Sequence, residues 1–423
     1  MKRIPPSSAL EKLAQDLANG DEAMDLTGEL LRIGARKIVQ GFLEAEVDEV
    51  LGRGYYERKS EDKAGYRNGY KKRRLDTAEG RLEIDLPQVR DTLEPFSSTL
   101  WEKLKKRTEV LENLVVEMYV RGLSTRDIED TLSELAPDDD LLLSRSTVSR
   151  ITETLWEEYE AFSERDLSGF DAVYLFADAV YESLRKQSGV KEGVLVTWAI
   201  LSDGSKVLIH MTTGNKESYE AWLDHFRSLV RRGLKTPLTI TSDGAPGLIK
   251  AIDAMWPESE RIRCWFHKMK NLLEKLPDDA KAIVKPYITA IRDAADYGMG
   301  KILAKRFIEM FEKEYPSMIK CFNEDIEASL AHLKLPAVHR KNIRTTNLIE
   351  RSFAEERRRS KVIPRFRSEQ ECLKLVYGTL WRASERWQRV RFSEHEQKAL
   401  DNYIKQRESE KEKKEEKVSV TVA

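Results

Sequence analysis

Four short apolar runs constrain the fold more than any other feature of the sequence. They cover residues 171–180, 193–201, 206–213 and 237–243, and Gly, Ser or Asp bounds them, as is typical of buried strands. An amphipathic stretch at 216–233 separates the third run from the fourth and is typical of a helix. Three strands in series, a helix and a fourth strand predict an α/β fold built on one sheet.

The composition allows a large core and excludes several classes of protein. Of 423 residues, 40% are hydrophobic and 34% are charged, but the net charge is only −1, so nucleic acid would have to bind local basic patches. Three scattered cysteines do not form a disulfide framework. Because we find no signal peptide and no long apolar stretch, we expect a soluble cytoplasmic protein without a membrane span.

The N-terminal part of the chain combines a helix, a basic segment and a strand. Helical spacing of apolar residues covers 22–52, and strand-like alternation covers 80–90. Between them, residues 53–74 hold nine Lys or Arg against three Asp or Glu, with four tyrosines among them. This segment is either an arm that contacts DNA or a solvated loop.

Residues 107–162 are predicted to be helical, with punctuation typical of a helix-turn-helix. Ser124 is placed to cap one helix, with Asp127 three residues later as in a capping box. A second short helix, capped by Ser144 or Ser146, follows. It would be the recognition helix, beginning near Arg145 and carrying Ser149 and Arg150. An ordinary helical bundle explains this segment equally well.

Two aspartates end apolar strands. Asp178 lies at the end of the first run, where a buried carboxylate must be hydrogen-bonded, paired or bound to metal. Asp243 ends the fourth run and is followed by glycine, so it falls at the carboxyl edge of the sheet, where ligands bind in open α/β folds. Each has a plainer explanation: Asp178 could bond a loop amide, and Asp-Gly is a common turn.

A third acidic residue, Glu350, begins a basic helix. Helical steps from Glu350 reach Arg357 and Lys361, and residues 341–367 hold nine Lys or Arg against three Glu. A metal-binding carboxylate followed by cations suits a site that grips a phosphodiester backbone. The alternative is a solvated basic helix with Glu350 in a surface salt bridge. Three carboxylates would suit two-metal catalysis, since Mg²⁺ prefers oxygen ligands.

Four motifs together resemble one family. LFADAVYESLR, TSDGAPGLIKAI, CWFHKMKN and TTNLIERSFAEERRRSK follow in the order seen in the mutator-type bacterial insertion-sequence transposases, a DDE group with an RNase H-like core. The likeness runs from about residue 22 to 395. The upstream pieces GYRNGYKKRR, GRLEIDLPQVR, GLSTRDI and STVSRI also look like the family's N-terminal region and helix-turn-helix.

The resemblance implies roles for individual residues. Asp178, Asp243 and Glu350 would be the catalytic, metal-binding triad, with two Mg²⁺ ions that Mn²⁺ can replace. Cys264 and His267 match a C-x-x-H element of unclear role; His267 would contact the scissile phosphate, and Trp265 would stack on an unpaired base. Zinc is disfavoured, because no second Cys/His pair lies near. The expected DNA contacts also include Arg185, Arg351, Arg357, Arg358 and Lys361. Ser183 stands where the family usually has Lys, which weakens one phosphate contact.

The expected domains follow from these assignments. They are an N-terminal region (1–100), a helix-turn-helix domain (101–165), an RNase H-like core in two parts (166–267 and 341–400), an all-helical insertion between them (268–340), and a charged tail that is either disordered or a frayed helix (401–423). The expected function is a transposase that binds the ends of its element, cuts them and joins them to target DNA, acting as a dimer or larger assembly near the bacterial nucleoid. A regulator with an inactive core and a nuclease for branched DNA or RNA–DNA hybrids are the alternatives.

Overall fold

The computed structural model describes residues 4–20, 25–58, 65–134, 142–183, 191–214, 218–361, 363, 366 and 368–422. The chain divides into two compact units, Met1–Thr154 and Leu155–Ala423. The finer domain boundaries stay predictions. Arg185 lies outside the described residues. None of the described helices is long and apolar enough to cross a membrane.

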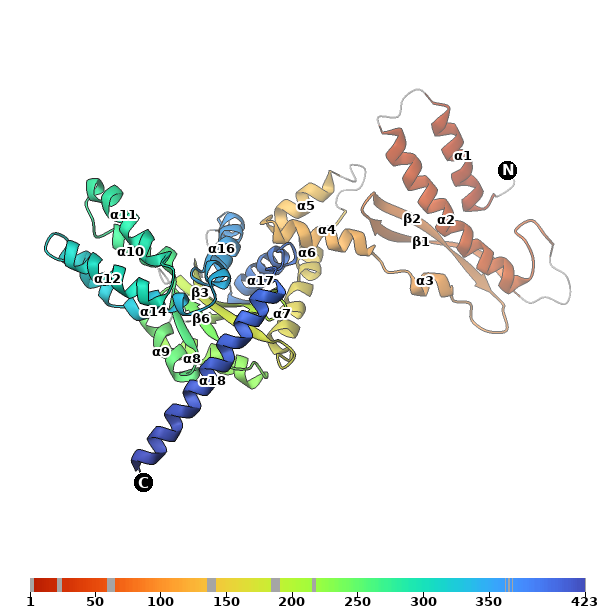
Figure 1. The fold of residues 1–423 in the computed structure, drawn as a ribbon. Coiled ribbons are helices and arrows are strands. Elements are labelled where there is room, and N and C mark those ends of the chain that lie inside the picture. Colours follow the sequence, from red (N-terminus) through yellow and green to blue (C-terminus); the bar gives the residue numbers. More distant parts are fainter. Residues whose placement is uncertain are drawn as a thin grey trace. The chain divides into compact units, whose positions relative to one another are not determined.

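Two helices and a hairpin begin the first unit (Figure 1). α1 (Pro6–Ala18) packs along α2 (Leu26–Leu51), and α2 packs on the hairpin of β1 (Tyr66–Thr77) and β2 (Gly80–Arg90). Leucine and isoleucine side chains of helix and hairpin form the small core between them: Leu43, Leu75, Leu82 and Ile84. The helix predicted at 22–52 and the strand predicted at 80–90 are therefore confirmed.

The basic segment is largely a strand. Residues 66–74 of the predicted arm or loop belong to β1, whose backbone pairs antiparallel with β2. The loop interpretation is wrong for these residues. On a paired strand the backbone is hydrogen-bonded to the neighbouring strand while the cationic side chains stay in contact with solvent.

Four helices complete the first unit. α3 (Thr99–Lys103) precedes α4 (Glu109–Val120), α5 (Thr125–Ser133) and α6 (Arg145–Thr152). The predicted capping box is confirmed, since Ser124 and Asp127 exchange hydrogen bonds at the start of α5. Ser144 is the residue before α6, which begins at Arg145 as predicted.

A mixed five-stranded sheet organises the second unit. Its order is β5-β4-β3-β6-β7, with β3, β4 and β5 antiparallel and with β6 and β7 parallel to β3. The strands are β3 (Ala172–Ser183), β4 (Lys191–Leu201), β5 (Lys206–Gly214), β6 (Thr239–Ser242) and β7 (Glu260–Arg263). The four predicted strands are confirmed. β7 has only four residues, two of them Arg, so no apolar run marked it in the sequence.

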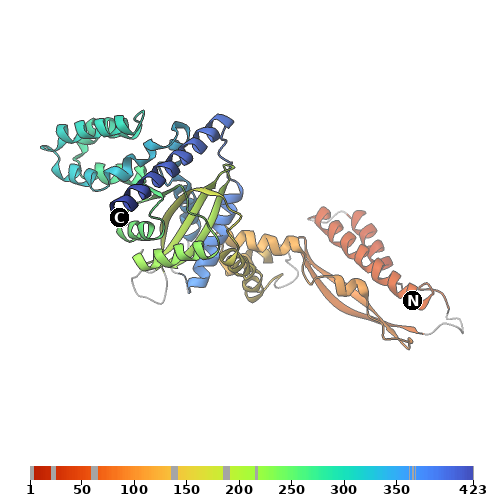
Figure 2. The same ribbon diagram turned by 60° about the horizontal axis from the view of Figure 1, so that its bottom comes forward.

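Helices cover both faces of this sheet (Figure 2). Trp222 and Phe226 of α8 (Tyr219–Arg231), with Leu248 of α9 (Pro246–Met255), pack in one core with Leu175 and Ala177 of β3. On the other face, α16 (Asn347–Ser360) contacts β3 and β4, and α17 (Glu369–Glu385) contacts β5. α17 also packs against α7 (Thr154–Glu164) through Tyr377 and Phe162.

Between β7 and α16 the described chain is helical, as predicted for 268–340. The helices are α10 (Trp265–Leu273), α11 (Asp278–Arg292), α12 (Tyr297–Phe311), α13 (Pro316–Asn323), α14 (Ile326–Leu330), the 3-10 turn η1 (Ala331–Lys334) and α15 (Ala337–Ile343). They have a core of their own, which includes Val284, Phe307 and Phe322.

The charged tail is helical in the described residues. Of the two expected alternatives, a frayed helix or disorder, α18 (Glu394–Val422) agrees with the helix. Glu and Lys are frequent in this segment, and both are strong helix formers.

Buried histidine predicts acid sensitivity of the second unit. His225 is 2% exposed and bonds Thr197 and Thr212 at 2.9 and 2.7 Å. Burial, and then Arg232, lower the pKa of His225 to about 3. Its unfolded pKa is about 6.5, so its contribution is complete above that pH and is lost as pH falls towards 3.

Between pH 7.5 and 5.5 this single histidine should cost about 1.4 kcal/mol of unfolding free energy. Urea unfolding at both pH values measures the loss, and His225→Gln, which cannot titrate but can still bond both threonines, should reduce the difference by about that amount. An unchanged difference in His225→Gln would contradict the assignment.

Candidate active site

Two neighbouring parallel strands bring Asp178 and Asp243 together. In the register of β3 and β6, Ala177 lies opposite Ser242, so the next residues of the two strands are level. Ala177 faces the core beneath α8 and α9, and Asp178 therefore faces α16 on the opposite side. Gly244 follows Asp243 with φ of 93°, and a Cβ there would lie 2.4 Å from Arg263 Cζ, so this turn requires glycine.

Two helix starts complete the cluster. Cys264 follows β7 and donates its N–H to Ser242 O at 2.8 Å, which places His267 in the first turn of α10. Glu350 lies in the first turn of α16, and His267 Nε2 is 3.1 Å from Glu350 Oε1. Ligand atoms of Asp178, His267 and Glu350 all lie within 4.8 Å of one another. Asp243 is outside that group but near enough to act on Asp178 electrostatically.

Asp178 is held in an unfavourable environment. It is 6% exposed, and Oδ1 accepts the Ala179 N–H at 2.9 Å, whereas Oδ2 has no hydrogen-bond partner among the described residues. Burial, and then the negative charge of Asp243, raise the pKa of Asp178 well above its ordinary value. Asp178 lies inside β3, which continues to Ser183, so the prediction that it ends its strand and the alternative that it bonds a loop amide are both wrong. The bond to the next strand residue accounts for one oxygen and leaves the other unexplained.

A divalent cation fits this arrangement. A buried carboxylate oxygen without a partner, beside a second carboxylate, is costly unless a cation compensates it. Asp178, Asp243 and Glu350 offer the oxygen ligands that Mg²⁺ and Mn²⁺ prefer. His267 Nε2 is engaged by Glu350, so the imidazole neighbours the carboxylates as a charge partner.

His267 is positively charged at neutral pH in this arrangement. Burial opposes its charge, but the Cys264 sulfur, Glu350 and Asp178 outweigh burial and raise the pKa of His267 to about 10. Contact with His267 in turn lowers the pKa of Glu350, against the effect of burial. Glu350 is 24% exposed and also lies 3.8 Å from Arg357. A solvated surface salt bridge alone does not describe it.

Cys264 ties the two helix starts together. Its Sγ accepts the Thr346 N–H and contacts Thr346 Oγ1, both at 3.2 Å. Thr346 immediately precedes α16 and accepts the Glu350 N–H, so this sulfur helps fix Glu350 relative to His267. The candidate metal cluster found in the described part of the chain contains Asp178, His267 and Glu350 and does not include Cys264.

The stacking role predicted for Trp265 does not fit its position. The ring is 1% exposed, and its N–H donates to Ser329 O at 2.7 Å, so a base has no free face to cover. The indole ring is buried because Trp265 packs α10 into the core of the helical segment. The neighbouring Phe266 is the exposed aromatic side chain, at 51%.

The predicted basic face of α16 is exposed. Arg351, Arg357, Arg358 and Lys361 all face solvent. Arg358 pairs with Glu355 at 2.9 Å, whereas Arg351 forms no ion pair with any described residue. In the first unit, Arg145, Ser149 and Arg150 are exposed on α6, and Arg145 pairs with Glu129 at 3.5 Å. Arg150 bonds only its neighbour Thr147, at 3.3 Å.

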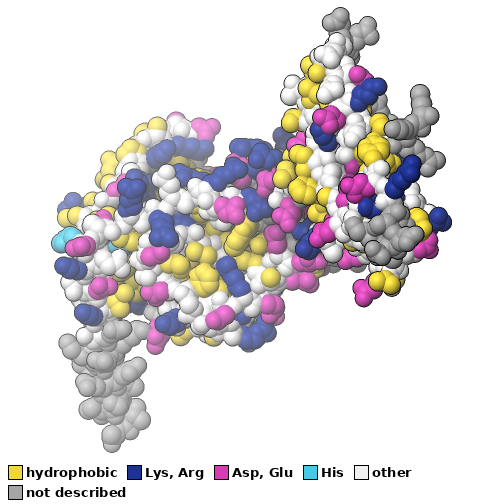
Figure 3. Space-filling model, turned by 90° about the vertical axis from the view of Figure 1, so that its right-hand side faces the viewer, with side chains coloured by type: hydrophobic (Ala, Val, Ile, Leu, Met, Phe, Trp, Pro, Cys, Tyr) yellow, Lys and Arg dark blue, Asp and Glu magenta, His cyan; other side chains and the backbone are white. Residues whose placement is uncertain are grey.

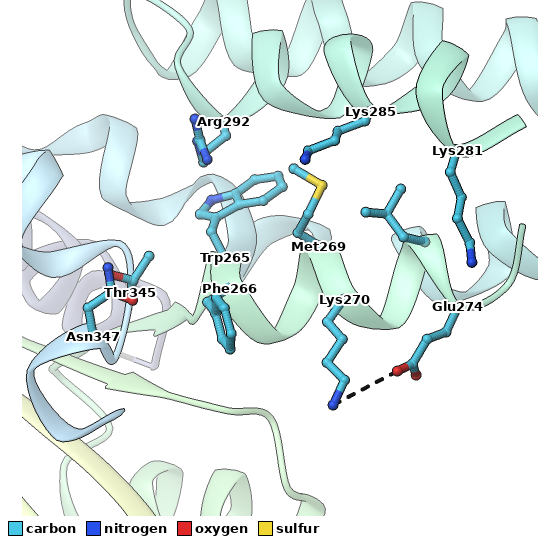
Figure 4. A pocket seen from close by; sticks show the side chains of 11 residues that line it. Trp265, Phe266, Met269, Lys270, Glu274, Lys281, Lys285, Arg292, Thr345 and Asn347 are labelled. Carbon is cyan, nitrogen blue, oxygen red and sulfur yellow. Dashed lines mark ion pairs between the residues drawn. The ribbon is translucent and has the colours of Figure 1, made fainter. Parts of the chain in front are cut away.

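Two pockets adjoin the segment that leads into Glu350. Thr345 and Asn347 line both of them. The first, of about 580 Å³, lies between α10 and α11: Trp265 and Met269 point towards α11, and Lys285 and Arg292 reach back from it (Figure 4).

The second pocket, of about 510 Å³, is strongly cationic. Among the described residues, four cations and no acid line it, and none of the four forms an ion pair within that part of the chain: Lys206, Lys341, Arg351 and Arg386. We call it the cationic pocket. The sequence analysis named only Arg351 among these four. Lys206, Lys341 and Arg386 are far apart along the chain and come close together only in the folded protein. Elsewhere cations and acids alternate over the surface seen in Figure 3.

Comparison with known proteins shows the family. The model described as "Transposase, Mutator family" matches residues 8–390. The chain is 34% identical over 358 residues to the transposase for insertion sequence element ISRM5 of Rhizobium meliloti, covering 84% of this chain and 88% of that one. It is 32% identical over 369 residues to that for IS406 of Burkholderia multivorans, covering 87% and 92%. The chain belongs to the Mutator family of transposases.

Proposed function

We propose that this protein is a DDE transposase that binds the ends of its insertion sequence, cuts them at their 3′ ends and joins the freed 3′-OH groups to target DNA. The observation that carries the proposal is the buried Asp178, whose unpartnered oxygen lies in one cluster with Glu350 and beside Asp243. Strand order β5-β4-β3-β6-β7, with the first three strands antiparallel, supports an RNase H-like core.

Each residue of the cluster has a task in this proposal. Asp178, Asp243 and Glu350 would hold two Mg²⁺ or Mn²⁺ ions, which supply an activated nucleophile and stabilise the leaving oxygen. The charged His267 would orient Glu350 through Nε2 and offset the negative charge of the acidic cluster, and it could contact the scissile phosphate only if Nε2 left Glu350. Cys264, through Thr346, positions Glu350.

DNA would approach across the cationic pocket and the exposed face of α16. Unpaired cations attract phosphates without first breaking an internal ion pair, and four of them line this pocket. Phe266 and the rim of the neighbouring apolar pocket offer a surface for a base near the cut.

We propose that α5 and α6 form the helix-turn-helix that reads the element's ends. Arg150 is the better base-reading candidate, because Arg145 already pairs with Glu129. Arg150→Ala should weaken binding to end DNA by about tenfold or more, the value of one good base contact. A gel-shift series measures this, with Arg121→Ala before α5 as the control. Equal affinities for the two variants and the parent would argue for an ordinary helical bundle.

The proposed chemistry is tested by incubating the protein with duplexes that carry its element's ends. Cleavage is expected with Mg²⁺ or Mn²⁺ and not with EDTA, and Asp243→Ala should bind the ends without cutting them. Metal-dependent cutting that Asp243→Ala retains would overturn the acidic set. Binding without cutting under every condition, also with paired ends, would favour a regulator.

A further inference from the structure

α2 carries an apolar stripe that its own unit leaves uncovered. Leu31, Ile38 and Phe42 are 59%, 62% and 63% exposed, and Ala35 and Ala45 are exposed between and beyond them. These five residues, the α2 stripe, are spaced four, three, four and three apart, which is the spacing of a coiled-coil seam. Hydrophobic side chains gather on the face of this unit seen in Figure 3.

The opposite side of α2 is the side that packs within the unit. Ile33, Gln40, Leu43 and Val47 are buried there, against α1 and the β1–β2 hairpin. The stripe is therefore a second apolar face on a helix that already has one. A surface helix that serves one core carries a single such face.

Two glycines point to the same conclusion independently. Gly34 and Gly41 lie inside α2, where glycine lowers helix stability, and a Cβ at either position would meet nothing within 4 Å. Neither glycine makes room for another part of the described chain. Small residues beside an apolar seam allow a second helix to approach closely.

We infer that the α2 stripe is an interface at which two copies of this chain associate through antiparallel α2 helices. Turned about the level of Gln40, four of the five stripe residues match one another: Ile38 of one copy meets Phe42 of the other, and Ala35 meets Ala45. Leu31 then lies opposite Glu49 at the end of the contact. Large side chains then meet in the centre, with small ones on either side, as an isologous two-fold contact requires.

Charge along α2 selects the antiparallel direction. The first half carries three cations and one acid (Arg32, Arg36, Lys37 and Glu29), and the second half carries four acids and no cation (Glu44, Glu46, Asp48 and Glu49). Several of these charges have partners in their own chain, such as Arg36 with Asp85 and Lys37 with Glu11. The net gradient remains, and antiparallel helices also oppose their dipoles favourably. A parallel pair would place like charges side by side.

The test uses the full-length protein without DNA or metal, so its result does not depend on transposase activity. Light scattering over a range of concentrations should show a dimer, and Ile38→Glu or Phe42→Glu should raise the dissociation constant at least about thirtyfold. Val50→Glu is the matched control, because Val50 is 52% exposed on the same helix but lies off the stripe. A parent that stays monomeric at about 100 µM, or equal weakening by Val50→Glu, would overturn the proposal.

Cross-linking tests the direction. A mixture of Leu31→Cys and Glu49→Cys should be joined by a short bis-maleimide, whereas Leu31→Cys alone should not, because the two Leu31 positions would lie about 27 Å apart. The parent controls for its own thiols, of which Cys264 and Cys372 are buried. Joining of Leu31→Cys to itself would overturn the antiparallel arrangement. Protection of Leu31→Cys in a monomer would mean that the stripe docks within its own chain.

Discussion

Replacing Asp178 with Asn is expected to abolish DNA cleavage and, in the metal-free protein, to stabilise the fold. Asn keeps the shape of the side chain but removes a buried charge beside Asp243. Relief of that burial and repulsion should stabilise the metal-free protein at pH 8. Loss of one metal ligand should lower the cleavage rate at least about a thousandfold, since several kcal/mol of transition-state stabilisation depend on it.

The stability gain should depend on pH with a definite sign. Because the folded pKa of Asp178 is raised, its carboxyl stabilises the fold at a pH below its unfolded value of about 4, and this contribution is lost as pH rises through the folded pKa. The melting temperature of Asp178→Asn should therefore exceed that of the parent at pH 8 and converge with it near pH 4.

Two comparisons make this result specific. Mg²⁺ should raise the melting temperature of the parent and not that of Asp178→Asn. Asp243→Asn should also stop cleavage but gain little stability, because Asp243 is half-buried and bonds the Ala245 N–H at 2.9 Å. Retained cleavage by Asp178→Asn would remove it from the acidic set, and a destabilised variant would mean that its carboxylate is compensated within the protein.

Neutralising the cationic pocket should weaken DNA binding by at least about a hundredfold. Lys341→Gln combined with Arg386→Gln removes two exposed, unpaired cations that do not touch the acidic cluster. Each lost charge-assisted contact to a phosphate costs about 1.5–3 kcal/mol. The slope of log affinity against log salt should become shallower by about 1.8, which is about 0.9 for each phosphate.

Titrating DNA at several KCl concentrations measures both quantities. Lys313→Gln with Lys320→Gln is the matched control: both residues are exposed and unpaired in the described chain, and neither lines the pocket. An equal loss of DNA affinity in this control would mean that the effect comes from the change in net charge and not from the pocket. Lower affinity with an unchanged salt slope would mean that the pocket does not bind phosphates.

The sequence predicted those parts of the fold that carry a local signal. Apolar runs marked β3, β4, β5 and β6, and the Ser124 capping box marked the start of α5. β7 carries two Arg in four residues, so no pattern reveals it, although it sets the position of Cys264 and His267.

The candidate site was predictable in its residues but not in its contacts. Asp178 lies within an apolar run and Asp243 ends one, whereas Glu350 stands out at the start of a basic helix and through its likeness to a family motif. The stacking role predicted for Trp265 does not fit its burial. The sequence around an aromatic residue beside a charged cluster looks the same whether the ring packs in a core or is exposed to solvent. The cationic pocket has no local signature, since Lys206 and Arg386 meet only through the tertiary fold.

The order of elements along the chain also determines when the site exists during synthesis. Asp178 lies on β3, but Glu350 is brought to it by α16, which packs on α17, the helix that ends at Glu385. The intervening helical segment has a core of its own and can fold as it emerges from the ribosome. Glu350 cannot join Asp178 and Asp243 until that whole segment and α17 have left the exit tunnel. A truncated chain would therefore release folded pieces in which the acidic cluster is incomplete.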